Sequence, residues 1–503
     1  MAPVFILFPA MNRPAASGRC RDAEVGLSMQ LVINQNPVEV EANPGGIALD
    51  LLRGRLGLTG VKDACREGDC GACTILHGRL QEGRVLYHAV VSCLLPLGDC
   101  AGTHLVTIEG LSPAPVDAGP VLERHPLNPL QQAFLDQGAI QCGFCTPGLV
   151  VALTGWLLTA AQWDEEEALL SIAGNICRCT GYLSIRRAVR QVLAQLPDAA
   201  APRLESLIAA GFVPAYFAGV PGQLAAFTQP TAAAAEPDKI RIAGGTDLLV
   251  QKPEQMAAAA VELIGGRPEL RGIAVTAGWC RIGGAVTVEE LRLSAELRTI
   301  LPDLPRFLEL VSSTQIRNRA TVAGNLINAS PIGDLTILLL ALGAEIELTD
   351  GDSSRSMPLR AFYLGYKKLD RREEELLSAV RFPLPQPGDL YNFEKVSRRE
   401  HLDIASVNSA CLLRLNGGRV EEIHLAAGGV APVPLYLEAC CAYLRGRELD
   451  ESVLAEAVRV AGSEIAPIDD VRGSAEYKRL LLRQLLQAHF VRLMPERFGG
   501  GAA

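Results

Sequence analysis

The sequence has few aromatic residues, no excess of positive charge and no apolar run that could cross a membrane. Aromatic residues make up 5% of the 503 residues, and 47 Lys and Arg face 56 Asp and Glu, which gives a formal net charge of −9. This charge argues against nucleic acid as a partner, because binding nucleic acid requires neutralising its phosphates. The nearest approach to a membrane span is Leu149 to Ala160, shorter than the roughly 18 apolar residues needed. We therefore expect no transmembrane helix.

We also expect no export signal. The apolar run Val4 to Ala10 has no basic region before it and is too short for a secretory signal peptide. We expect residues 1–28 to be an unstructured extension, the first strand to begin at Met29, and the protein to be soluble and cytoplasmic. With 49% hydrophobic and 20% charged residues, the chain has enough apolar material for large folded cores.

Cysteines, in contrast, are numerous and unevenly distributed. Nine of the 14 lie between Cys65 and Cys179, and the other five are scattered over the rest of the chain. In a chain without an export signal, such crowding indicates metal ligation rather than disulfide bridges.

The sequence pattern divides the first 196 residues into two small domains. Residues 29–111 combine a β-hairpin, a helix at 48–56 and a cysteine-rich loop, which predicts a small α+β domain. Its further strands are expected at residues 74–77, 85–89 and 105–108. After a linker candidate at 112–125, residues 126–196 have helical periods and predict a four-helix bundle, in which Thr146 is the expected N-cap of the second helix.

The rest of the chain is expected to hold a linker and a larger mixed region. Residues 197–226 are rich in Ala and Pro and predict a second linker. From residue 227 onward, strands, glycine turns and helical stretches alternate, and this region is large enough for two lobes, at 227–385 and 386–495.

The first group of cysteines has the spacing of a plant-type [2Fe–2S] site. Cys65, Cys70 and Cys73 follow the pattern Cys-x4-Cys-x2-Cys, and Cys93 supplies a distant fourth ligand. Three thiolates from one loop must wrap around the two irons, and the glycines within the loop permit the backbone conformations this needs. The alternatives are a structural zinc site, or reduced cysteines in a β core. Zinc ligands usually come in two separate pairs, which fits this loop badly.

The second group is more ambiguous from spacing alone. Cys142 and Cys145 form a Cys-x2-Cys pair, and Cys177 and Cys179 form a Cys-x-Cys pair after a long interval. Either zinc or one further iron–sulfur cluster could take these four ligands. Cys100 has no place in either group, and a small buried hydrophobe is its expected role.

Two glycine-bearing loops suggest phosphate binding. The first is residues 242–248, Ile-Ala-Gly-Gly-Thr-Asp-Leu, and the second is residues 321–334, which begin Thr-Val-Ala-Gly-Asn. Such loops can bring backbone N–H groups close to a phosphate. Neither matches Gly-x-Gly-x-x-Gly, so a Rossmann site is not indicated.

Longer strings around these sites resemble one family. Residues 65–73 (Cys-Arg-Glu-Gly-Asp-Cys-Gly-Ala-Cys), 141–148 (Gln-Cys-Gly-Phe-Cys-Thr-Pro-Gly) and 174–182 (Gly-Asn-Ile-Cys-Arg-Cys-Thr-Gly-Tyr) are similar to the two [2Fe–2S] modules of the molybdenum hydroxylases. That family includes xanthine dehydrogenase, aldehyde oxidase and carbon monoxide dehydrogenase. The resemblance implies that the second group of cysteines also holds a [2Fe–2S] cluster.

The two glycine-bearing loops and their surroundings resemble the flavin domain of the same family. Matching strings include Ser-Thr-Gln-Ile-Arg-Asn at 313–318, Phe-Thr-Gln-Pro at 227–230, and the segments 362–367 and 394–400. The resemblance thus runs from about residue 29 to 490.

The fold class that this resemblance implies is multidomain α+β. It comprises a β-grasp ferredoxin-like domain, a four-helix-bundle [2Fe–2S] domain, an α+β FAD-binding domain of the vanillyl-alcohol-oxidase type, and a C-terminal α/β lobe like that of the CO dehydrogenase flavoprotein.

The resemblance also implies the residues that contact the flavin and the nicotinamide. Tyr366 and Asp403 would lie near the nicotinamide site. His401 and Leu402 precede Asp403 where eukaryotic relatives have a shorter acidic stretch, so access to the flavin is expected to differ. The residues that would contact FAD are Arg241, Ile242, Ala243, Gly244, Gly245, Thr246, Asp247, Leu248, Thr321, Val322, Ala323, Gly324, Asn325, Asp334, Leu376 and Lys395.

No catalytic residue is expected on this chain, because residues 430–503 are too few for a molybdopterin domain. A separate large subunit carrying the molybdenum cofactor is expected, in a heterotetramer of two small and two large subunits. The resemblance implies that electrons from hypoxanthine or xanthine pass from molybdenum through the two clusters to FAD and then NAD+, yielding urate in purine catabolism. Two alternatives stay open: an aldehyde or other N-heterocycle hydroxylase, and a free-standing NADH-linked iron–sulfur flavoprotein.

Overall fold

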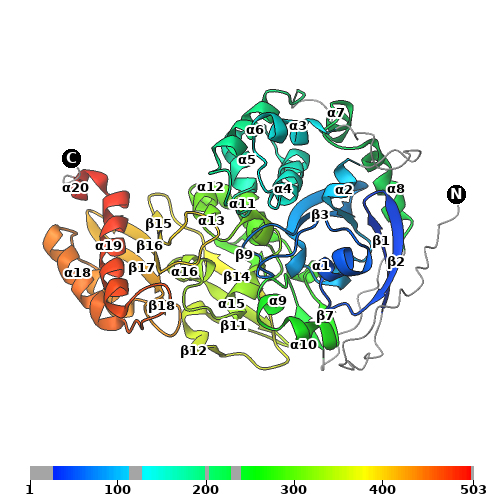
Figure 1. Cartoon of the computed structure of the whole chain (residues 1–503). Coiled ribbons are helices and arrows are strands. Elements are labelled where there is room, and N and C mark those ends of the chain that lie inside the picture. The colour runs from blue at the N-terminus through cyan, green and yellow to red at the C-terminus, as the bar shows by residue number, and fades with distance from the viewer. Residues whose placement is uncertain (1–26, 113–126, 199–202, 228–238, 500–503) are drawn as a thin grey trace, which may run out of the picture. The chain divides into compact units, whose positions relative to one another are not determined.

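The computed structural model describes residues 27–112, 127–198, 203–227 and 239–499 (Figure 1). The chain divides into two compact units. The first unit is Met1–Leu263 with Ser313–Arg319, and the second is Ile264–Ser312 with Ala320–Ala503. The predicted extension at 1–28 and the predicted linker at 112–125 lie almost entirely outside the described residues.

The first unit begins with a sheet in the strand order β2-β1-β5-β3-β4. Strands β1 and β5 are parallel, and the other neighbours are antiparallel. A short helix, α1 (Ala48–Asp50), continues as a π-helical turn at Leu51–Arg55 and buries its leucines against the sheet. The strands are β1 (Leu27–Ile33), β2 (Asn36–Ala42), β3 (Thr74–Gln81), β4 (Arg84–Val91) and β5 (His104–Val106). The predicted β-grasp fold class is confirmed.

Three of the predicted strands have different boundaries in the structure. The β3–β4 hairpin is several residues longer than predicted, because it closes through Glu82 and Gly83, whose positive φ angles of 48° and 78° match the twist of a tight hairpin. The predicted strand at 105–108 is too long, because Ile108 begins helix α2 (Ile108–Leu111).

Four helices at 127–198 form the predicted helical module. They are α3 (Pro129–Asp136), α4 (Thr146–Thr159), α5 (Glu165–Ser171) and α6 (Leu183–Leu193). Helix α4 is buried on nearly all sides and packs against β3 and β4. The prediction that Thr146 caps α4 is wrong: Cys145 is the N-cap residue, and its helical backbone makes Thr146 the first helical position.

The segment predicted as a linker at 197–226 contains helices. They are α7 (Arg203–Ala209), the 3₁₀ helix η4 (Ala215–Gly219) and α8 (Val220–Ala225). Phe217 is buried against Tyr87 and His104, and Val220 packs with Val32 in a small apolar cluster. The few large apolar residues among the alanines and prolines thus hold this segment on the first sheet.

Short elements complete the first unit. Strands β6 (Ile240–Ile242) and β7 (Val261–Leu263) are parallel and are connected through α9 (Leu248–Gln251) and α10 (Pro253–Ala258). Helix α14 (Thr314–Arg317) also belongs to this unit, as part of the segment Ser313–Arg319, although the chain before and after that segment belongs to the second unit.

The second unit contains an antiparallel sheet in the order β11-β10-β14-β9-β8. Its strands are β8 (Ile273–Thr276), β9 (Trp279–Gly283), β10 (Glu345–Thr349), β11 (Ser354–Pro358) and β14 (Leu376–Pro383), beside the small hairpin of β12 (Tyr363–Gly365) and β13 (Lys368–Leu369). A large apolar core lies between this sheet and the helices. Those helices are α11 (Val288–Leu293), α12 (Ala295–Ile300), α13 (Leu304–Glu309), α15 (Val322–Ile327) and α16 (Asp334–Ala341).

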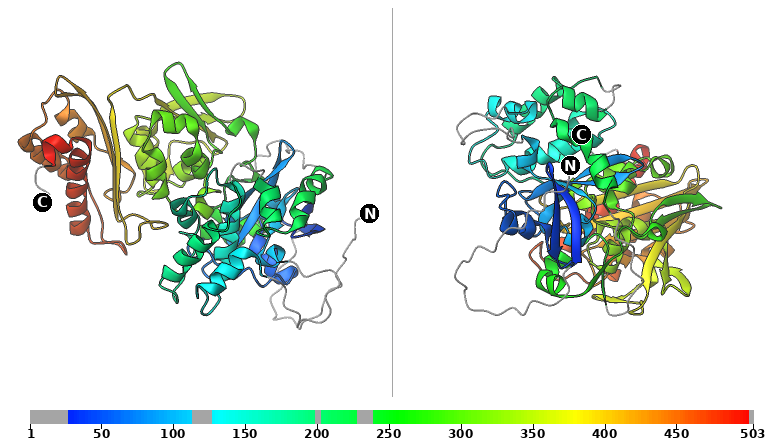
Figure 2. Two further views of the ribbon diagram at one scale, coloured as in Figure 1. Left: turned by 90° about the horizontal axis from the view of Figure 1, so that it is seen from above. Right: turned by 90° about the vertical axis from the view of Figure 1, so that its right-hand side faces the viewer.

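The C-terminal lobe of the second unit is built on the sheet β15-β16-β17-β18. Alternate residues of β16 enter different cores: Ala410 and Leu412 join the core with α16, whereas Cys411 and Leu413 join the core with the C-terminal helices. Helix α19 lies along β15 and β16 (Figure 2). The elements are β15 (Leu390–Val396), β16 (Val407–Asn416), β17 (Arg419–Gly428), β18 (Leu435–Tyr436), α17 (Glu438–Leu444), α18 (Glu451–Glu464), α19 (Ala475–Leu493) and α20 (Pro495–Phe498).

Within the described ranges, no helix combines the length and the apolar character needed to cross a bilayer.

Candidate functional site

The first cysteine loop, between η1 and β3, turns sharply. Arg66, Gly68 and Gly71 all have positive φ angles, of 57°, 74° and 65°. The turns bring the thiols together in two hydrogen-bonded pairs, Cys65 with Cys70 and Cys73 with Cys93. The four predicted ligands of the plant-type site thus lie as two close pairs.

The environment of this loop favours thiolates. A hydrogen bond from Cys70, helped by backbone N–H groups of the loop, lowers the pKa of Cys65 to about 5. A hydrogen bond from Cys93 likewise lowers the pKa of Cys73, while the pKa of each donor thiol is raised. Since the thiolate is the metal-binding form, one member of each pair is prepared for ligation.

The second group of cysteines lies at the N-terminal ends of two helices. Cys142 and Cys145 precede α4, and Cys177 and Cys179 precede α6. The sulfurs of Cys142 and Cys179 are 3.6 Å apart. A disulfide would require about 2.05 Å, whereas two thiolates that each lie about 2.3 Å from one tetrahedral metal would be about 3.8 Å apart.

The other two thiols of this group also form a pair. Burial, followed by a hydrogen bond with Cys177, raises the pKa of Cys145 to about 12. Burial opposes ionisation of Cys177 as well, but hydrogen bonds from the Thr180 hydroxyl and from backbone N–H groups outweigh it, so the pKa of Cys177 is lowered. In the second group, as in the first, a thiol with a lowered pKa is thus paired with a thiol whose pKa is raised.

Pairs of sulfurs are the arrangement that suits a binuclear cluster, in which each iron takes two protein thiolates. All eight predicted ligands are free cysteines. In the part of the chain that the structure describes, no group of three or more His, Cys, Asp or Glu side chains is arranged to hold a single metal ion. Cys100 is buried and donates to the Pro96 carbonyl, and burial raises the pKa of its thiol to about 12.

The two cysteine groups are joined by backbone contacts within the first unit. The N–H of Ile176 donates to the carbonyl of Cys70 at 3.0 Å, and the side chain of Asn175 donates to the carbonyl of Gly71 at 2.8 Å. A Cβ on Gly71 would lie 2.5 Å from the Gly174 carbonyl oxygen. Only glycine therefore fits where the two cysteine loops meet.

The first predicted flavin loop follows β6 in the first unit. Gly245 has a φ of 79°, and Asp247 accepts from the side chain of Gln251. The Gly244 carbonyl accepts from Arg319 at 3.0 and 3.2 Å, and Arg319 also pairs with the buried Asp99. Arg319 was not predicted, yet it fixes the orientation of this loop.

The second predicted flavin loop opens α15 in the second unit. The Thr321 hydroxyl accepts from the N–H of Gly324 at 3.1 Å and caps the helix. The N–H groups of Val322 and Ala323 donate to the carbonyls of Val286 and Gly284. The loop is therefore anchored to the end of β9, and Asn325 follows within the first helical turn.

Asp334 and Lys395, two other predicted flavin contacts, form a nearly buried ion pair. Their nitrogen–oxygen distance is 2.7 Å, and the side chains are 11% and 1% exposed. Lys395 also donates to the Leu310 carbonyl at 2.6 Å, and Asn408 donates to Asp334 at 2.6 Å. Leu376, half-buried, begins β14. Asn408 was not predicted.

The two predicted nicotinamide residues are placed differently from each other. Tyr366 is 65% exposed, in the turn between β12 and β13. The Asp403 carboxylate accepts from the backbone N–H groups of Arg398 and Arg399. No hydrogen bond or ion pair among the described residues joins Tyr366 to Asp403.

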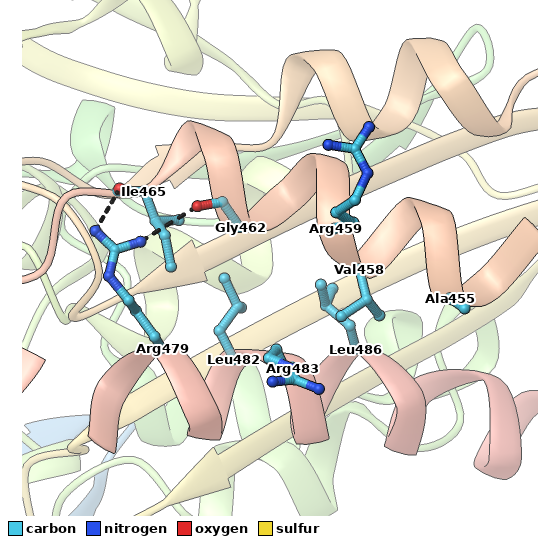
Figure 3. A pocket seen from close by; sticks show the side chains of 9 residues that line it. All are labelled: Ala455, Val458, Arg459, Gly462, Ile465, Arg479, Leu482, Arg483 and Leu486. Atoms are coloured by element: carbon cyan, nitrogen blue, oxygen red, sulfur yellow. Dashed lines mark hydrogen bonds between the residues drawn. The ribbon is translucent and has the colours of Figure 1, made fainter. Parts of the chain in front are cut away.

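A cavity of about 410 Å³ lies elsewhere, between α18 and α19 of the C-terminal lobe (Figure 3). None of the predicted site residues lines it. Its apolar floor is bordered by Arg459, Arg479 and Arg483, and Arg479 donates to the carbonyls of Gly462 and Ile465.

Four family models match successive parts of the chain. They are "2Fe-2S iron-sulfur cluster binding domain" at residues 31–96, "[2Fe-2S] binding domain" at 107–190, "FAD binding domain in molybdopterin dehydrogenase" at 219–385, and "CO dehydrogenase flavoprotein C-terminal domain" at 392–493.

Two curated relatives agree with these matches. Xanthine dehydrogenase 1 of Arabidopsis thaliana is 29% identical over 87% of this chain and 38% of its own length. Aldehyde oxidase 2 of Mus musculus is 27% identical over 94% of this chain and 40% of its own length. A solved chain of reconstituted CO dehydrogenase from Oligotropha carboxidovorans is 31% identical, with a TM-score of 0.49, over 51% of this chain and 90% of that chain. This chain thus spans about two-fifths of the curated relatives' length.

The chain belongs to the molybdenum hydroxylase family. Within that family, its matched domains define the iron–sulfur and FAD electron-transfer subunit.

Proposed function

We propose that this chain is the small subunit of a xanthine dehydrogenase. In this role it passes electrons from a molybdenum site on a partner subunit through two [2Fe–2S] clusters to FAD and NAD+, while hypoxanthine and xanthine are oxidised to urate in purine catabolism. Such clusters carry single electrons, and a flavin pairs them for transfer as hydride.

The observation that carries the proposal is the contact between the two cysteine loops. Cys70 and Cys177 belong to different groups, yet the N–H of Ile176, next to Cys177, donates to the carbonyl of Cys70. One hydrogen bond and a few covalent bonds therefore connect a ligand of one group to a ligand of the other. This short connection supports a relay function for the two groups.

The ligand assignments belong to the proposal. Cys65, Cys70, Cys73 and Cys93 would hold the plant-type cluster, and Cys142, Cys145, Cys177 and Cys179 would hold the other. The paired thiols support both assignments.

The FAD assignment draws on the resemblance and, at the first loop, on local structure. The backbone turn at Gly244 and Gly245 is of the kind that can bring N–H groups to a phosphate. At the start of α15 the N–H groups of Val322, Ala323 and Gly324 are bonded within the chain, so the assignment of Thr321 to Asn325 draws on the resemblance alone. The Asp334–Lys395 pair offers a carboxylate and an ammonium that would contact the isoalloxazine or its surroundings, together with Leu376. Tyr366 and Asp403 would lie near the nicotinamide.

A large subunit with the molybdenum cofactor would supply the substrate site. The matched relatives are longer than this chain by more than half their length, which supports a further component that completes the enzyme. We propose a heterotetramer of two small and two large subunits, located in the cytoplasm.

Aldehyde oxidation is the second candidate, because aldehyde oxidase 2 of Mus musculus matches at nearly the same identity as the plant xanthine dehydrogenase. The purified complex, assayed with xanthine and with aromatic aldehydes, decides between them. We expect NAD+ reduction that depends on xanthine. Turnover of aldehydes without turnover of xanthine would refute the xanthine dehydrogenase assignment and support aldehyde oxidation. Recovery of no large subunit together with full NADH-dependent dye reduction would refute both candidates.

A further inference from the structure

Residues 313–319 cross from one unit to the other. The chain on both sides of this segment belongs to the second unit, whereas the segment itself, with helix α14, belongs to the first. Its side chains alternate between buried and half-buried, and Gln315 and Arg317 are completely buried. A polar segment that is buried in this way must have specific partners.

Gln315 binds the helical module next to the second cysteine group. Its side-chain amide donates to the carbonyl of Ser171 and to the side-chain oxygen of Asn175, both at 2.9 Å. The neighbouring Thr314 donates to the Leu170 carbonyl at 3.1 Å. Gln315 therefore fixes the side chain of Asn175, which is only 2% exposed.

Asn175 in turn binds the first cysteine loop. With its oxygen held by Gln315, its amide group points to the Gly71 carbonyl at 2.8 Å and lies 3.4 Å from the Thr74 hydroxyl. Gly71 directly follows Cys70, and Asn175 lies two residues before Cys177. Three side-chain and backbone groups thus form one chain of hydrogen bonds from Gln315 to a cluster-binding loop.

Ile316, the next residue of the segment 313–319, also contacts the first cysteine loop. A Cβ on Gly68 would lie 2.6 Å from the terminal carbon of Ile316, and a Cβ on Gly174 would lie 2.5 Å from the Gln315 side-chain oxygen. Consecutive residues of the segment are therefore in van der Waals contact with a glycine of each cysteine loop. The spacing between the loops has little freedom while this segment is in place.

We propose that Gln315, acting through Asn175, is a positioning residue that fixes the two cysteine loops relative to each other and thereby sets the magnetic and electronic coupling between the clusters. This inference rests on the proposed function, because it requires that both cysteine groups hold [2Fe–2S] clusters. Gln315 touches neither group of cysteines directly. Its effect is exerted on the distance and orientation between them.

The test is low-temperature EPR spectroscopy of the reduced, full-length protein and its Gln315→Leu variant. Two paramagnetic clusters held close together split each other's signals, and this splitting falls steeply with distance. Leucine has nearly the volume of glutamine but cannot donate to Ser171 or Asn175. We expect the variant to keep its iron and FAD while the splitting decreases and the midpoint potentials of the clusters shift.

Asn318→Leu is the matched control. Asn318 lies on the same segment and donates to the Ala89 carbonyl at 2.8 Å, in strand β4 and not in either cysteine loop. It should lose a comparable hydrogen bond and keep the wild-type splitting and potentials. Unchanged splitting and potentials in Gln315→Leu, or equal changes in both variants, would overturn the proposal.

A second variant covers the case in which Gln315→Leu loses a cluster. Asn175→Asp keeps an acceptor for the Gln315 amide and removes the donor to Gly71. Wild-type splitting in Asn175→Asp would overturn the proposal, and reduced splitting would support it. The wild-type protein distinguishes failure of this proposal from failure of the proposed function. If the proposed function is wrong, iron analysis and EPR will not find two clusters in the wild-type protein itself.

Discussion

The ion pair between Lys395 and Asp334 should be a major stabiliser of the second unit. The change Lys395→Met keeps the length and the apolar stem of the side chain but removes the ammonium group. The Asp334 carboxylate then retains Asn408 as a partner but loses its counter-charge, and the Leu310 carbonyl loses its donor.

The size of the effect follows from burial. Lys395 is 1% exposed and Asp334 is 11% exposed, so water replaces the lost partner poorly. Breaking a buried pair on one side costs about 3–5 kcal/mol, which raises the unfolding equilibrium constant by roughly two to three and a half powers of ten. With an m-value of about 2–3 kcal/mol/M in urea, the midpoint should fall by about 1–2.5 M.

Tryptophan fluorescence can follow the second unit separately. Of the three tryptophans, Trp156 and Trp163 lie in the first unit and Trp279 lies in β9 of the second. In a Trp156→Phe/Trp163→Phe background, urea denaturation of the FAD-free protein therefore reports on the second unit. FAD must be absent so that lost flavin binding does not add to the effect.

A double variant separates the unpaired charge from other causes. Lys395→Met combined with Asp334→Asn leaves no buried charge, while the new side-chain amide at position 334 could still bond to Asn408. We expect this double variant to be more stable than Lys395→Met alone. A loss below about 1 kcal/mol in the single variant, or no recovery in the double variant, would refute the argument.

Three further predictions concern the first unit. Burial opposes ionisation of Asp99, but two guanidinium groups outweigh it and hold the pKa of Asp99 below its usual value. Asp99→Asn should therefore lower the free energy of unfolding at pH 7. The difference from wild type should disappear as the pH falls through the depressed pKa, which urea denaturation between pH 7 and 3 can follow. Gly71→Ala should reduce the iron content, because the left-handed backbone costs about 1–2 kcal/mol and the new Cβ clashes with Gly174. Gly83→Ala is the control: Gly83 also has a positive φ but has open space around it, so this variant should keep its iron. Cys177→Ser should abolish one of two [2Fe–2S] EPR signals and retain FAD, while Cys100→Ser should keep both signals; two signals in the Cys177 variant would contradict the ligand assignment.

The closeness of the thiols in the first cysteine loop was largely predictable from the sequence, because their spacing is local. Cys65, Cys70 and Cys73 share one loop, and the glycines between them adopt the positive φ angles that the spacing requires. The same locality applies to Asp164, the N-cap of α5, since its partner is the N–H of Glu167 three residues away.

The supports of these sites were not predictable, because their partners are far away in the sequence. Gln315 bonds to a residue 140 positions earlier, and Arg319 pairs with one 220 positions earlier. Asn408 likewise reaches Asp334 across 74 positions. Nothing in the local sequence distinguishes these side chains from polar residues on a surface.

Composition alone also misjudged the segment at 197–226. Alanine and proline predicted a linker, but Leu207, Phe212, Phe217 and Leu224 are buried at intervals along it. Because these few residues are widely spaced, no regular period identified the helices. Whether these residues are buried depends on the first sheet, against which the segment packs.

The position of residues 313–319 in the chain has a consequence for how the protein matures in a cell. Synthesis proceeds from the N-terminus, so both cysteine groups leave the ribosome well before Gln315 and Arg319 are made. Asn175 and Asp99 each have one partner, Gln315 and Arg319 respectively, that arrives only with the middle of the chain. A gene divided after Leu263 would encode a first half that carries every cysteine ligand but lacks these partners, so iron insertion into that half alone should yield clusters that are lost more readily than those of the whole chain.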